Sequence, residues 1–233
     1  MAGTIGILET GTPPGDLAAR HGRYDAMMRA LLGPDAATRT YDIPAGEWPA
    51  DVAAHPAYLI TGSSAGVYDP LPWIAPLKDF IRRAQPHAKL VGICFGHQIM
   101  AEALGGRVEK SHKGWGVGLH DYAVVAAMPW MGEAAPARIA VAASHQDQVV
   151  EPPPGATVIL ASAFTPYAAL LYGGGGAVSM QFHPEFTHAF ASELVERRRA
   201  ALPDGMADRA MASLQGESDA ARVAGWVRAF LNE

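Results

Sequence analysis

The sequence predicts an α/β fold: a mostly parallel central sheet with helices on both faces, accompanied by a smaller antiparallel sheet. Two observations support this prediction. Strand-like apolar runs alternate with amphipathic stretches through the first half of the chain, whereas later strand-like runs follow one another closely. The 233 residues are 49% hydrophobic and 18% charged, which is ample material for a core. We therefore expect a single domain over residues 1–233 that ends in a helical extension over about residues 196–233.

Strands and helices alternate in the first half. Short apolar runs indicate strands over residues 4–8, 38–43, 57–60 and 89–93. Amphipathic stretches indicate helices over residues 16–32, 73–84 and 97–104. Asp16 is a candidate N-cap for the first of these helices, Gly33-Pro34 stops it, and Pro86 stops the second. Strands that alternate with helices pair in parallel, so both faces of the sheet should be covered.

The second half predicts closely spaced strands followed by helices. Its apolar runs indicate strands over residues 117–125, 138–143, 158–163, 168–172 and 177–182. Glycines at 173–176 predict a hairpin turn rather than a phosphate-binding loop, because neither a Lys-Ser/Thr pair nor a helix follows them. Helices return over residues 189–201 and 220–231, and residues 201–217 are expected to be irregular.

Composition argues against several classes of protein. The chain has 18 Lys plus Arg against 23 Asp plus Glu, a formal charge of -5, whereas a dedicated nucleic-acid binder normally presents a basic face. No apolar run approaches the ~20 residues that span a bilayer. The start, Met1-Ala2-Gly3-Thr4, lacks the basic and apolar parts of a signal peptide. We therefore expect a cytoplasmic protein that binds neither nucleic acid nor membrane.

The histidine and cysteine content limits metal and cofactor chemistry. A single cysteine forms no intrachain disulfide and no multi-cysteine zinc site. The sequence has no His-x-x-x-His or His-Glu-x-x-His pair, so we predict no metal. It also has no P-loop and no Gly-x-Gly-x-x-Gly after a strand. We therefore predict no cofactor, and no ATP-dependent product from this chain alone.

The most informative segment is residues 92–97, Gly-Ile-Cys-Phe-Gly-His. A buried strand ends in Cys94, which has a glycine two positions away on each side, as in the cysteine version of a nucleophile elbow. In that strand-to-helix turn the side chain projects above the sheet, where the helix dipole favours a thiolate. The amide of Phe95 would point into the same space and stabilise an oxyanion. The alternative is a buried structural cysteine between chance glycines.

A thiolate nucleophile needs a base, and the base needs an orienting group. His183 follows an apolar strand and precedes Pro184, which suits a strand end because it has no amide donor. Residues two apart on a strand face the same side, so Glu185 can contact His183 and select its tautomer. The alternative is a histidine and a glutamate that are simply exposed after a strand.

These segments resemble the class I glutamine amidotransferase family. Residues 59–69, Leu-Ile-Thr-Gly-Ser-Ser-Ala-Gly-Val-Tyr-Asp, resemble its oxyanion loop, and residues 92–98 are similar to its nucleophile motif. Leu104-Gly105-Gly106 follows at the expected place. Residues 144–149, Ser-His-Gln-Asp-Gln-Val, resemble the loop that holds the amino-acid end of the substrate, and Phe182-His183-Pro184-Glu185 completes the set. The blocks stand in family order over about residues 4–195, which implies the family's flavodoxin-like fold.

The resemblance implies a reaction through a γ-glutamyl thioester. Cys94 would attack the side-chain carboxamide of glutamine, and His183 would move the thiol proton to the leaving amine. Glu185 would orient His183, and water or another amine would resolve the thioester. The amides of Ser63 and Phe95 would form the oxyanion hole. The glutamyl end of the substrate would be bound by Gly62, Gln98, Ser144, His145, Gln146 and Asp147.

One position departs from the family pattern. The family has two adjacent glycines in the oxyanion loop, whereas this chain has Gly62-Ser63. A serine is costly wherever the backbone requires a positive φ. We therefore expect a rearranged loop or a site suited to another acyl group, with weak activity on free glutamine.

Three functions are compatible with these residues. The favoured one is a stand-alone enzyme that acts on glutamine or a γ-glutamyl compound, because residues 14–24 resemble members similar to the glutaminase part of GMP synthase and to plant γ-glutamyl peptidases. The second is a glutaminase subunit that supplies ammonia to a separate synthase partner, which predicts an exposed apolar patch. The third is a non-enzymatic sensor of glutamyl ligands, which has no need of Cys94, His183 and Glu185 together.

Two other features have simpler interpretations. Arg197, Arg198 and Arg199 lie in a predicted helix with glutamates at helical spacing, which indicates a solvated face rather than an anion site. The tryptophans are expected to pack in the core. Trp115 is the exception to watch, because it lies between the nucleophile helix and the later strands and could wall the pocket.

Overall fold

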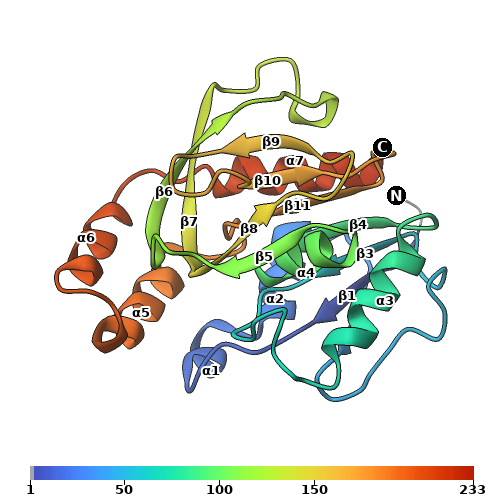
Figure 1. Cartoon of the computed structure of the whole chain (residues 1–233), viewed down its shortest axis with the longest axis horizontal. Helices are drawn as coiled ribbons and strands as arrows, with labels where there is room; N and C mark the ends of the chain where they lie inside the picture. Colours follow the sequence, from blue (N-terminus) through green and yellow to red (C-terminus); the bar gives the residue numbers. More distant parts are fainter. Residues whose placement is uncertain (1–2) are drawn as a thin grey trace.

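A computed structural model describes residues 3–233, so the sequence arguments about Met1 and Ala2 lie outside the described residues. Within that range a nine-stranded mixed sheet runs through the molecule (Figure 1). Its parallel part consists, in spatial order, of β2 (Thr38–Asp42), β1 (Ile5–Glu9), β3 (Ala57–Ile60), β4 (Lys89–Ile93) and β11 (Ala177–Met180). Its antiparallel part continues with β10 (Ala169–Leu171), β9 (Thr157–Ala161), β6 (Gly116–Val124) and β7 (Arg138–His145).

The predicted α/β class, with a mostly parallel sheet and a smaller antiparallel one, is confirmed. The later strands extend the central sheet, and the hairpin expected at residues 173–176 joins β10 to β11. The smaller sheet pairs β5 (Arg107–Lys110) with β8 (Asp147–Glu151), two strands that the sequence did not indicate. In β5 only Val108 is buried, so this short polar strand lacks an apolar pattern.

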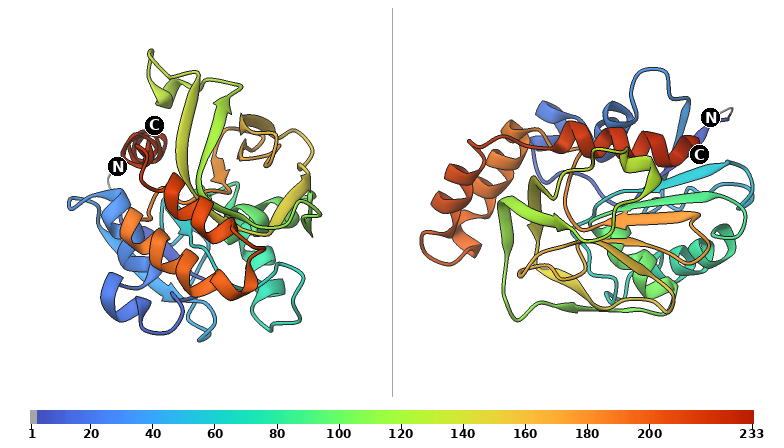
Figure 2. Two further views of the ribbon diagram at one scale, coloured as in Figure 1. Left: turned by 90° about the vertical axis from the view of Figure 1, so that its left-hand side faces the viewer. Right: turned by 90° about the horizontal axis from the view of Figure 1, so that it is seen from above.

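Helices cover both faces of the sheet. On one face lie α2 (Tyr24–Leu32) and α7 (Ala220–Asn232), and on the other lie α3 (Ile74–Ala84) and α4 (Phe95–Ala103). Figure 2 shows α7 and α3 on opposite sides of the sheet. Strand β1 demonstrates why both faces are needed: Ile7 belongs to the core under α2 and α7, whereas Leu8 belongs to the core under α3 and α4.

Two helical predictions are wrong. The single helix expected over residues 16–32 is divided into α1 (Leu17–His21) and α2, because Gly22 adopts a φ of 86° and ends the first helix. The region expected to be irregular contains α6 (Met206–Ser213), which follows α5 (His188–Arg198). None of the helices in the described part is long and apolar enough to cross a membrane.

The parallel strands end at one edge of the sheet, and this edge carries the candidate residues. Thr10 follows β1, Thr61 follows β3, Cys94 follows β4, and His183 lies just beyond the end of β11. In open α/β sheets, ligands bind outside the carboxyl ends of the strands. The topology alone therefore brings together residues that are far apart in the sequence.

Candidate active site

Cys94 occupies a strained turn between β4 and α4. Its φ of 53° and ψ of -100° make it the one non-glycine residue with a positive φ among residues 3–233. Such a conformation costs on the order of 1–3 kcal/mol and is found mainly at functional sites. Its amide donates to the Met180 carbonyl at 2.8 Å, which ties the turn to β11. Helix α4 begins at Phe95, two residues earlier than expected, so the thiol lies directly at its N-terminus.

The glycines on either side of Cys94 are required by close packing. A Cβ atom on Gly92 would lie 2.5 Å from the carbonyl oxygen of Gly96. A Cβ atom on Gly96 would lie 2.4 Å from the carbonyl oxygen of Ile60. Neither backbone atom can move away easily, so the turn has room only for glycine at these two positions. The Gly-x-Cys-x-Gly spacing is therefore a steric feature of this strand-to-helix turn.

His183 and Glu185 form a buried pair. Nδ1 of His183 lies 2.7 Å from Oε1 of Glu185, and the His183 ring stacks on Phe186 with centroids 3.9 Å apart. The His183 amide also donates to the Ala142 carbonyl at 2.8 Å. The carboxylate of Glu185 and the ring of Phe186 thus hold the imidazole, and the amide bond fixes the backbone of His183. Both residues lie in a turn beyond Met180, where β11 ends, so their contact arises from that turn and not from the strand alternation we expected.

The charge on His183 is set by its neighbours. Burial alone lowers the pKa of His183, but the Glu185 carboxylate and Cys94 outweigh it and raise the pKa to about 10. The other ring nitrogen, Nε2, is buried and has no hydrogen bond of normal geometry to any described residue. A cationic imidazole carries a proton on Nε2, and with Cys94 as its neighbour the ring is suited to hold and return that proton.

Gln181 is a site residue that the sequence analysis missed. Its Nε2 lies 3.6 Å from Sγ of Cys94, and its Oε1 accepts from Nε2 of Gln98 at 3.2 Å. Gln98 Nε2 also donates to the Asp147 carbonyl at 2.8 Å. Gln181 therefore connects the candidate nucleophile to two of the expected substrate-binding residues. Its position two residues before His183, directly after β11, was the available signal.

The loop after β3 passes directly over Cys94 and His183. A Cβ atom on Gly62 would lie 3.3 Å from Cε1 of His183 and 3.8 Å from Cβ of Cys94. The Gly62 carbonyl accepts from the Thr10 hydroxyl at 3.1 Å, which points it toward β1. In a planar trans peptide the following N–H points the opposite way, so this contact also sets the direction of the Ser63 amide.

Ser63 fits its loop without backbone strain. Its φ is not positive, so the expectation of a costly serine at this position is wrong. Its hydroxyl accepts from the Ala65 amide at 3.2 Å, and the residue packs closely against Gly11. The serine therefore stabilises the turn, and no rearrangement is needed to accommodate its side chain.

Residues 144–147 lie where β7 turns into β8, and three of them are held there by hydrogen bonds to their neighbours. The side chain of His145 is buried, donates from Nδ1 to the Asp147 carbonyl at 3.2 Å and lies beside Phe164. Burial lowers the pKa of His145 to about 3, so this ring is neutral. The Asp147 carboxylate accepts from the Tyr68 hydroxyl at 2.8 Å, which links this loop to the one after β3. The Gln146 carbonyl faces away and accepts from the Ser111 amide at 3.0 Å.

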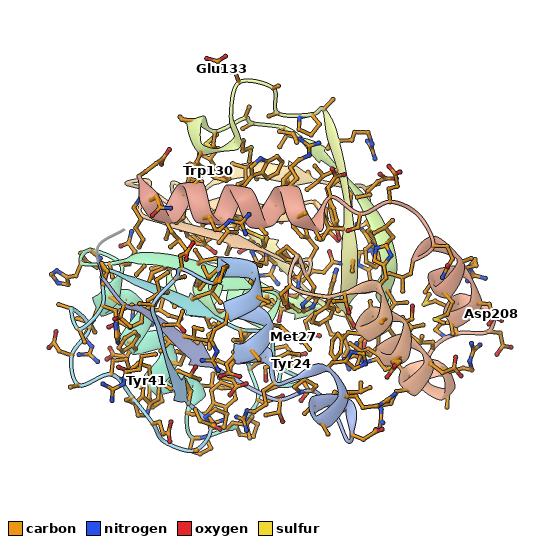
Figure 3. All side chains as sticks on the ribbon, turned by 180° about the vertical axis from the view of Figure 1, so that it is seen from behind. Tyr24, Met27, Tyr41, Trp130, Glu133 and Asp208 are labelled. Atoms are coloured by element: carbon orange, nitrogen blue, oxygen red, sulfur yellow. The ribbon has the colours of Figure 1, made fainter. Side chains whose placement is uncertain are left out.

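A cavity of about 580 Å³ opens beside the candidate site. Ser64, Tyr24 and Arg198 are among the residues that line it. Figure 3 shows Tyr24 at the start of α2, on the side toward α5, and its ring stacks on Phe186 with centroids 6.3 Å apart. A larger hollow of about 1020 Å³ lies between α2 and the end of α7 and contains none of the candidate residues. The cavity beside Tyr24 reaches the candidate site at Ser64, next to Ser63, and a third hollow of about 310 Å³ is lined by Pro184, Glu185 and Phe186.

The three consecutive arginines of α5 do not share one environment, which corrects the expectation of a solvated face. Arg197 pairs with Asp16, and Arg199 pairs with Glu196 and Asp208. Arg198 points inward, stacks over the Trp115 ring at 4.9 Å and donates to the hydroxyl of Ser144. The sequence could not reveal this difference, because helical spacing does not show that α5 packs against β6 and β7 at Arg198. Trp115 therefore supports the wall of the cavity through Arg198.

No group of three or more His, Cys, Asp or Glu side chains suited to hold a metal ion occurs in the described part of the chain. Two other histidines serve as buried packing groups. His97 bonds to the Ser179 hydroxyl at 2.7 Å, and burial lowers its pKa to about 3. His55 bonds to the Tyr41 hydroxyl at 2.8 Å.

Known proteins resemble this chain in sequence and fold. The family model described as glutamine amidotransferase class-I matches residues 59–198. Gamma-glutamyl peptidase 4 of Arabidopsis thaliana is 30% identical over 201 residues, which is 82% of this chain and 79% of that protein. The glutamine-hydrolyzing GMP synthase of Thermus thermophilus is 36% identical over 136 residues, which is 57% of this chain but 25% of that protein. The chain thus corresponds to only part of that synthase.

The fold comparison agrees. A glutamine amidotransferase crystal structure from Thermotoga maritima has a TM-score of 0.75 at 20% identity and covers 98% of this chain and 96% of that one. At 20% identity this structural similarity shows the fold alone, whereas the matches to the family model and to the peptidase are similarities of sequence. Because the family model spans more than half of the chain, the chain belongs to the class I glutamine amidotransferase family.

Proposed function

We propose that this protein is a cysteine-dependent enzyme that hydrolyses or transfers the γ-glutamyl group of glutamine or of a γ-glutamyl compound. The observation that carries the proposal is the His183–Glu185 contact of 2.7 Å beside Cys94 in its strained turn. The match to γ-glutamyl peptidase 4 supports the same class of substrate. A nucleophile, a base and an orienting carboxylate are the groups that acyl transfer through a covalent intermediate requires.

In the first half of the reaction, Sγ of Cys94 attacks the γ-carbonyl carbon and forms a C–S bond. The carbonyl electrons move to oxygen, and the thiol proton is held on Nε2 of His183. The amides of Ser63 and Phe95 donate to the oxyanion, and the positive end of α4 favours the same charge. The intermediate then collapses, the C–N bond breaks, and His183 gives its proton to the leaving amine.

In the second half, water attacks the thioester. His183 takes a proton from the water, and the C–S bond breaks with the electron pair returning to sulfur. The products are glutamate and the regenerated Cys94–His183 pair. A primary amine in place of water would give a new γ-glutamyl amide by the same steps. Glu185 keeps the proton on Nδ1 throughout, so that Nε2 stays available to the reacting atoms.

The glutamyl end of the substrate lies, in this proposal, between α4 and the loop of residues 144–147. Gln98 is held by Asp147 and Gln181, so its side chain is already oriented before a ligand arrives. Ser144, whose hydroxyl accepts from Arg198, and Gln146 are further candidates at this end, and the buried His145 donates to the Asp147 carbonyl. Such preorganised polar groups bind an amino acid with a small loss of side-chain entropy.

The test is release of glutamate and ammonia by the purified chain, supplied with glutamine and with γ-glutamyl dipeptides and without any partner protein. We expect turnover that disappears in Cys94→Ala and Cys94→Ser while circular dichroism shows that both variants are folded. Mass spectrometry of wild type quenched during turnover should show a glutamyl adduct on Cys94. Full activity in Cys94→Ser would overturn the covalent mechanism.

A second candidate function is that of a glutaminase subunit for a separate synthase. Tyr68 and Leu71, in the loop near Asp147, are 54% and 39% exposed, which places apolar surface beside the site. The match to part of GMP synthase agrees with this alternative. It predicts negligible turnover by the isolated chain, together with labelling of Cys94 by a glutamine-like electrophile. Strong turnover in isolation would favour the stand-alone enzyme.

A further inference from the structure

Arg198 is a half-buried cation without a carboxylate partner. Its contacts are the Trp115 ring at 4.9 Å and the hydroxyl of Ser144, and no Asp or Glu among residues 3–233 forms an ion pair with it. Burial lowers the pKa of Arg198, which is opposed only by Tyr24 and Cys94. An unpaired guanidinium away from water is costly, so its retention in a cavity wall indicates an anion that binds there.

The other arginines that line the same cavity are already neutralised. Arg23 donates to Glu9 at 2.6 Å and to Asp42 at 2.7 Å. Arg197 is paired with Asp16. The cavity therefore offers one uncompensated positive charge rather than a diffuse basic surface. A single guanidinium with a free edge suits a single carboxylate, which it can bind through two parallel hydrogen bonds.

The position of Arg198 relates this charge to the candidate active site. The cavity that it lines also includes Ser64, next to the candidate oxyanion residue Ser63, and Tyr24. Tyr24 stacks on Phe186, which in turn stacks on His183. The hydroxyl of Tyr24 has no hydrogen-bond partner within residues 3–233 and provides a second donor on the same wall. The wall that carries Arg198 is thus adjacent to the candidate oxyanion loop at Ser64, and Tyr24 connects it to His183 through the ring of Phe186.

We propose that this cavity is the leaving-group subsite and that Arg198 binds a carboxylate on the leaving group. The preferred substrates would then be γ-glutamyl amino acids or peptides whose departing amine carries a free carboxylate, rather than glutamine, whose leaving group is ammonia. This inference rests on the proposed γ-glutamyl chemistry at Cys94. Arg198 acts here as a specificity-determining residue and takes no part in proton transfer.

The carboxylate that Arg198 binds could instead be the one at the glutamyl end of the substrate. That end is assigned to Gln98 and Asp147, which contact each other through the Gln98 amide and reach Cys94 by way of Gln181. None of these three residues lines the cavity of Arg198, which is built from α1, α2, α5 and the loops after β1 and β3. Among the residues assigned to the glutamyl end, Ser144 contacts Arg198, through its hydroxyl. The geometry therefore favours the leaving group, and substrates that differ only there can decide between the two.

The experiment compares three substrates: γ-glutamylalanine, γ-glutamylalaninamide and glutamine. We expect Arg198→Gln to lower kcat/KM for γ-glutamylalanine about 10- to 100-fold, the range of a charge-assisted hydrogen bond, and to leave the other two unchanged. Arg198→Lys should recover part of the loss. The matched control is Arg199→Gln, because Arg199 is the exposed neighbour paired with Glu196 and Asp208. Thermal melts establish that each variant is folded.

Equal losses on all three substrates would overturn the proposal, since they would indicate the glutamyl carboxylate or a structural role. An unchanged kcat/KM for γ-glutamylalanine would overturn it as well. Calorimetry on Cys94→Ala separates this inference from the proposed function, because binding is measured without turnover. We expect Cys94→Ala to bind γ-glutamylalanine more tightly than its amide, and Cys94→Ala/Arg198→Gln to bind both equally. No preference in Cys94→Ala would overturn the subsite whether or not the wild type turns over.

Discussion

The hydroxyl of Thr10 lies 3.1 Å from the carbonyl oxygen of Gly62, so the end of β1 is joined to the loop that passes over Cys94. The Thr10 amide donates to Oγ1 of Thr61 at 2.9 Å, and that hydroxyl in turn reaches the same Gly62 carbonyl at 3.1 Å. Both threonines are buried. The orientation of the peptide between Gly62 and Ser63 is therefore set by two hydroxyl groups that do not line the reacting centre.

Thr10→Val should impair catalysis more than binding. Without its hydroxyl the Gly62 carbonyl loses a donor, and the Ser63 amide is less firmly aimed at the oxyanion. We expect kcat to fall about 10- to 100-fold, somewhat less than complete loss of an oxyanion donor, with KM little changed. Unfolding free energy should fall by about 1–3 kcal/mol for the buried partners left unpaired.

Steady-state kinetics and chemical denaturation measure the two effects of Thr10→Val. Thr157→Val is the control, because Thr157 is exposed at the start of β9 and makes no hydrogen bond to the site. A rise in KM with an unchanged kcat would place the role of Thr10 in substrate binding.

Glu185→Gln should shift the pH dependence of the reaction. Glu185 raises the pKa of His183, so the imidazolium persists well above neutral pH in the wild type. With a neutral amide at position 185 the pKa of His183 falls, and the basic limb of the kcat/KM profile moves to lower pH. A pH–rate profile for each protein is the measurement. If the basic limb lies at the same pH in the wild type and in Glu185→Gln, Glu185 does not raise the pKa of His183.

Gly96→Ala tests the steric requirement of the elbow. The new methyl group would lie 2.4 Å from the Ile60 carbonyl oxygen, so β3 and α4 must separate. We expect a loss of about 1–3 kcal/mol in unfolding free energy and a large loss of activity as Cys94 moves. Gly173→Ala is the control, since its nearest neighbour would be 3.8 Å away. Equal stability of the two variants in urea would contradict the packing account.

Ser63→Gly restores the second glycine of the family pattern and should change little in the chemistry. Ser63 does not adopt a left-handed backbone conformation, so replacing it with glycine relieves no strain. We therefore expect the activity to change less than tenfold. Stability should fall by roughly 0.5–1 kcal/mol because glycine is more flexible in the unfolded chain. An increase in kcat on glutamine well above tenfold would show that the serine side chain obstructs the acyl site.

The parts of this protein that follow from local pattern were predictable from its sequence. Apolar runs such as residues 57–60 and 89–93 form strands where expected, because burial on both faces leaves a continuous apolar signature. The Gly-x-Cys-x-Gly spacing indicated the elbow because its steric demand is local. The contact between His183 and Glu185 also follows from two positions close in sequence, although a turn rather than a strand produces it.

Features that depend on distant neighbours were not predictable in the same way. Strand β5 is polar and short, and it becomes a strand only because β8 is available to pair with it. Arg198 differs from Arg197 and Arg199 only in what α5 packs against. Gln181 acquires its contacts with Cys94 and Gln98 from the adjacency of β11 and β4. In each case the deciding partner is remote in the sequence.

Strands β4 and β11 are neighbours in the sheet, with Ile93 opposite Met180, and the Cys94 amide is bonded to the Met180 carbonyl. The backbone ladder thus fixes the strand ends that precede Cys94 and His183, and the contacts with Glu185 and Phe186 then hold the imidazole. The cavity that Arg198 lines is built from α1, α2, α5 and the loops after β1 and β3, all outside that ladder. Substitutions in α1, α2, α5 and the loops after β1 and β3 can therefore reshape this cavity while the β4–β11 pairing that precedes Cys94 and His183 stays unchanged.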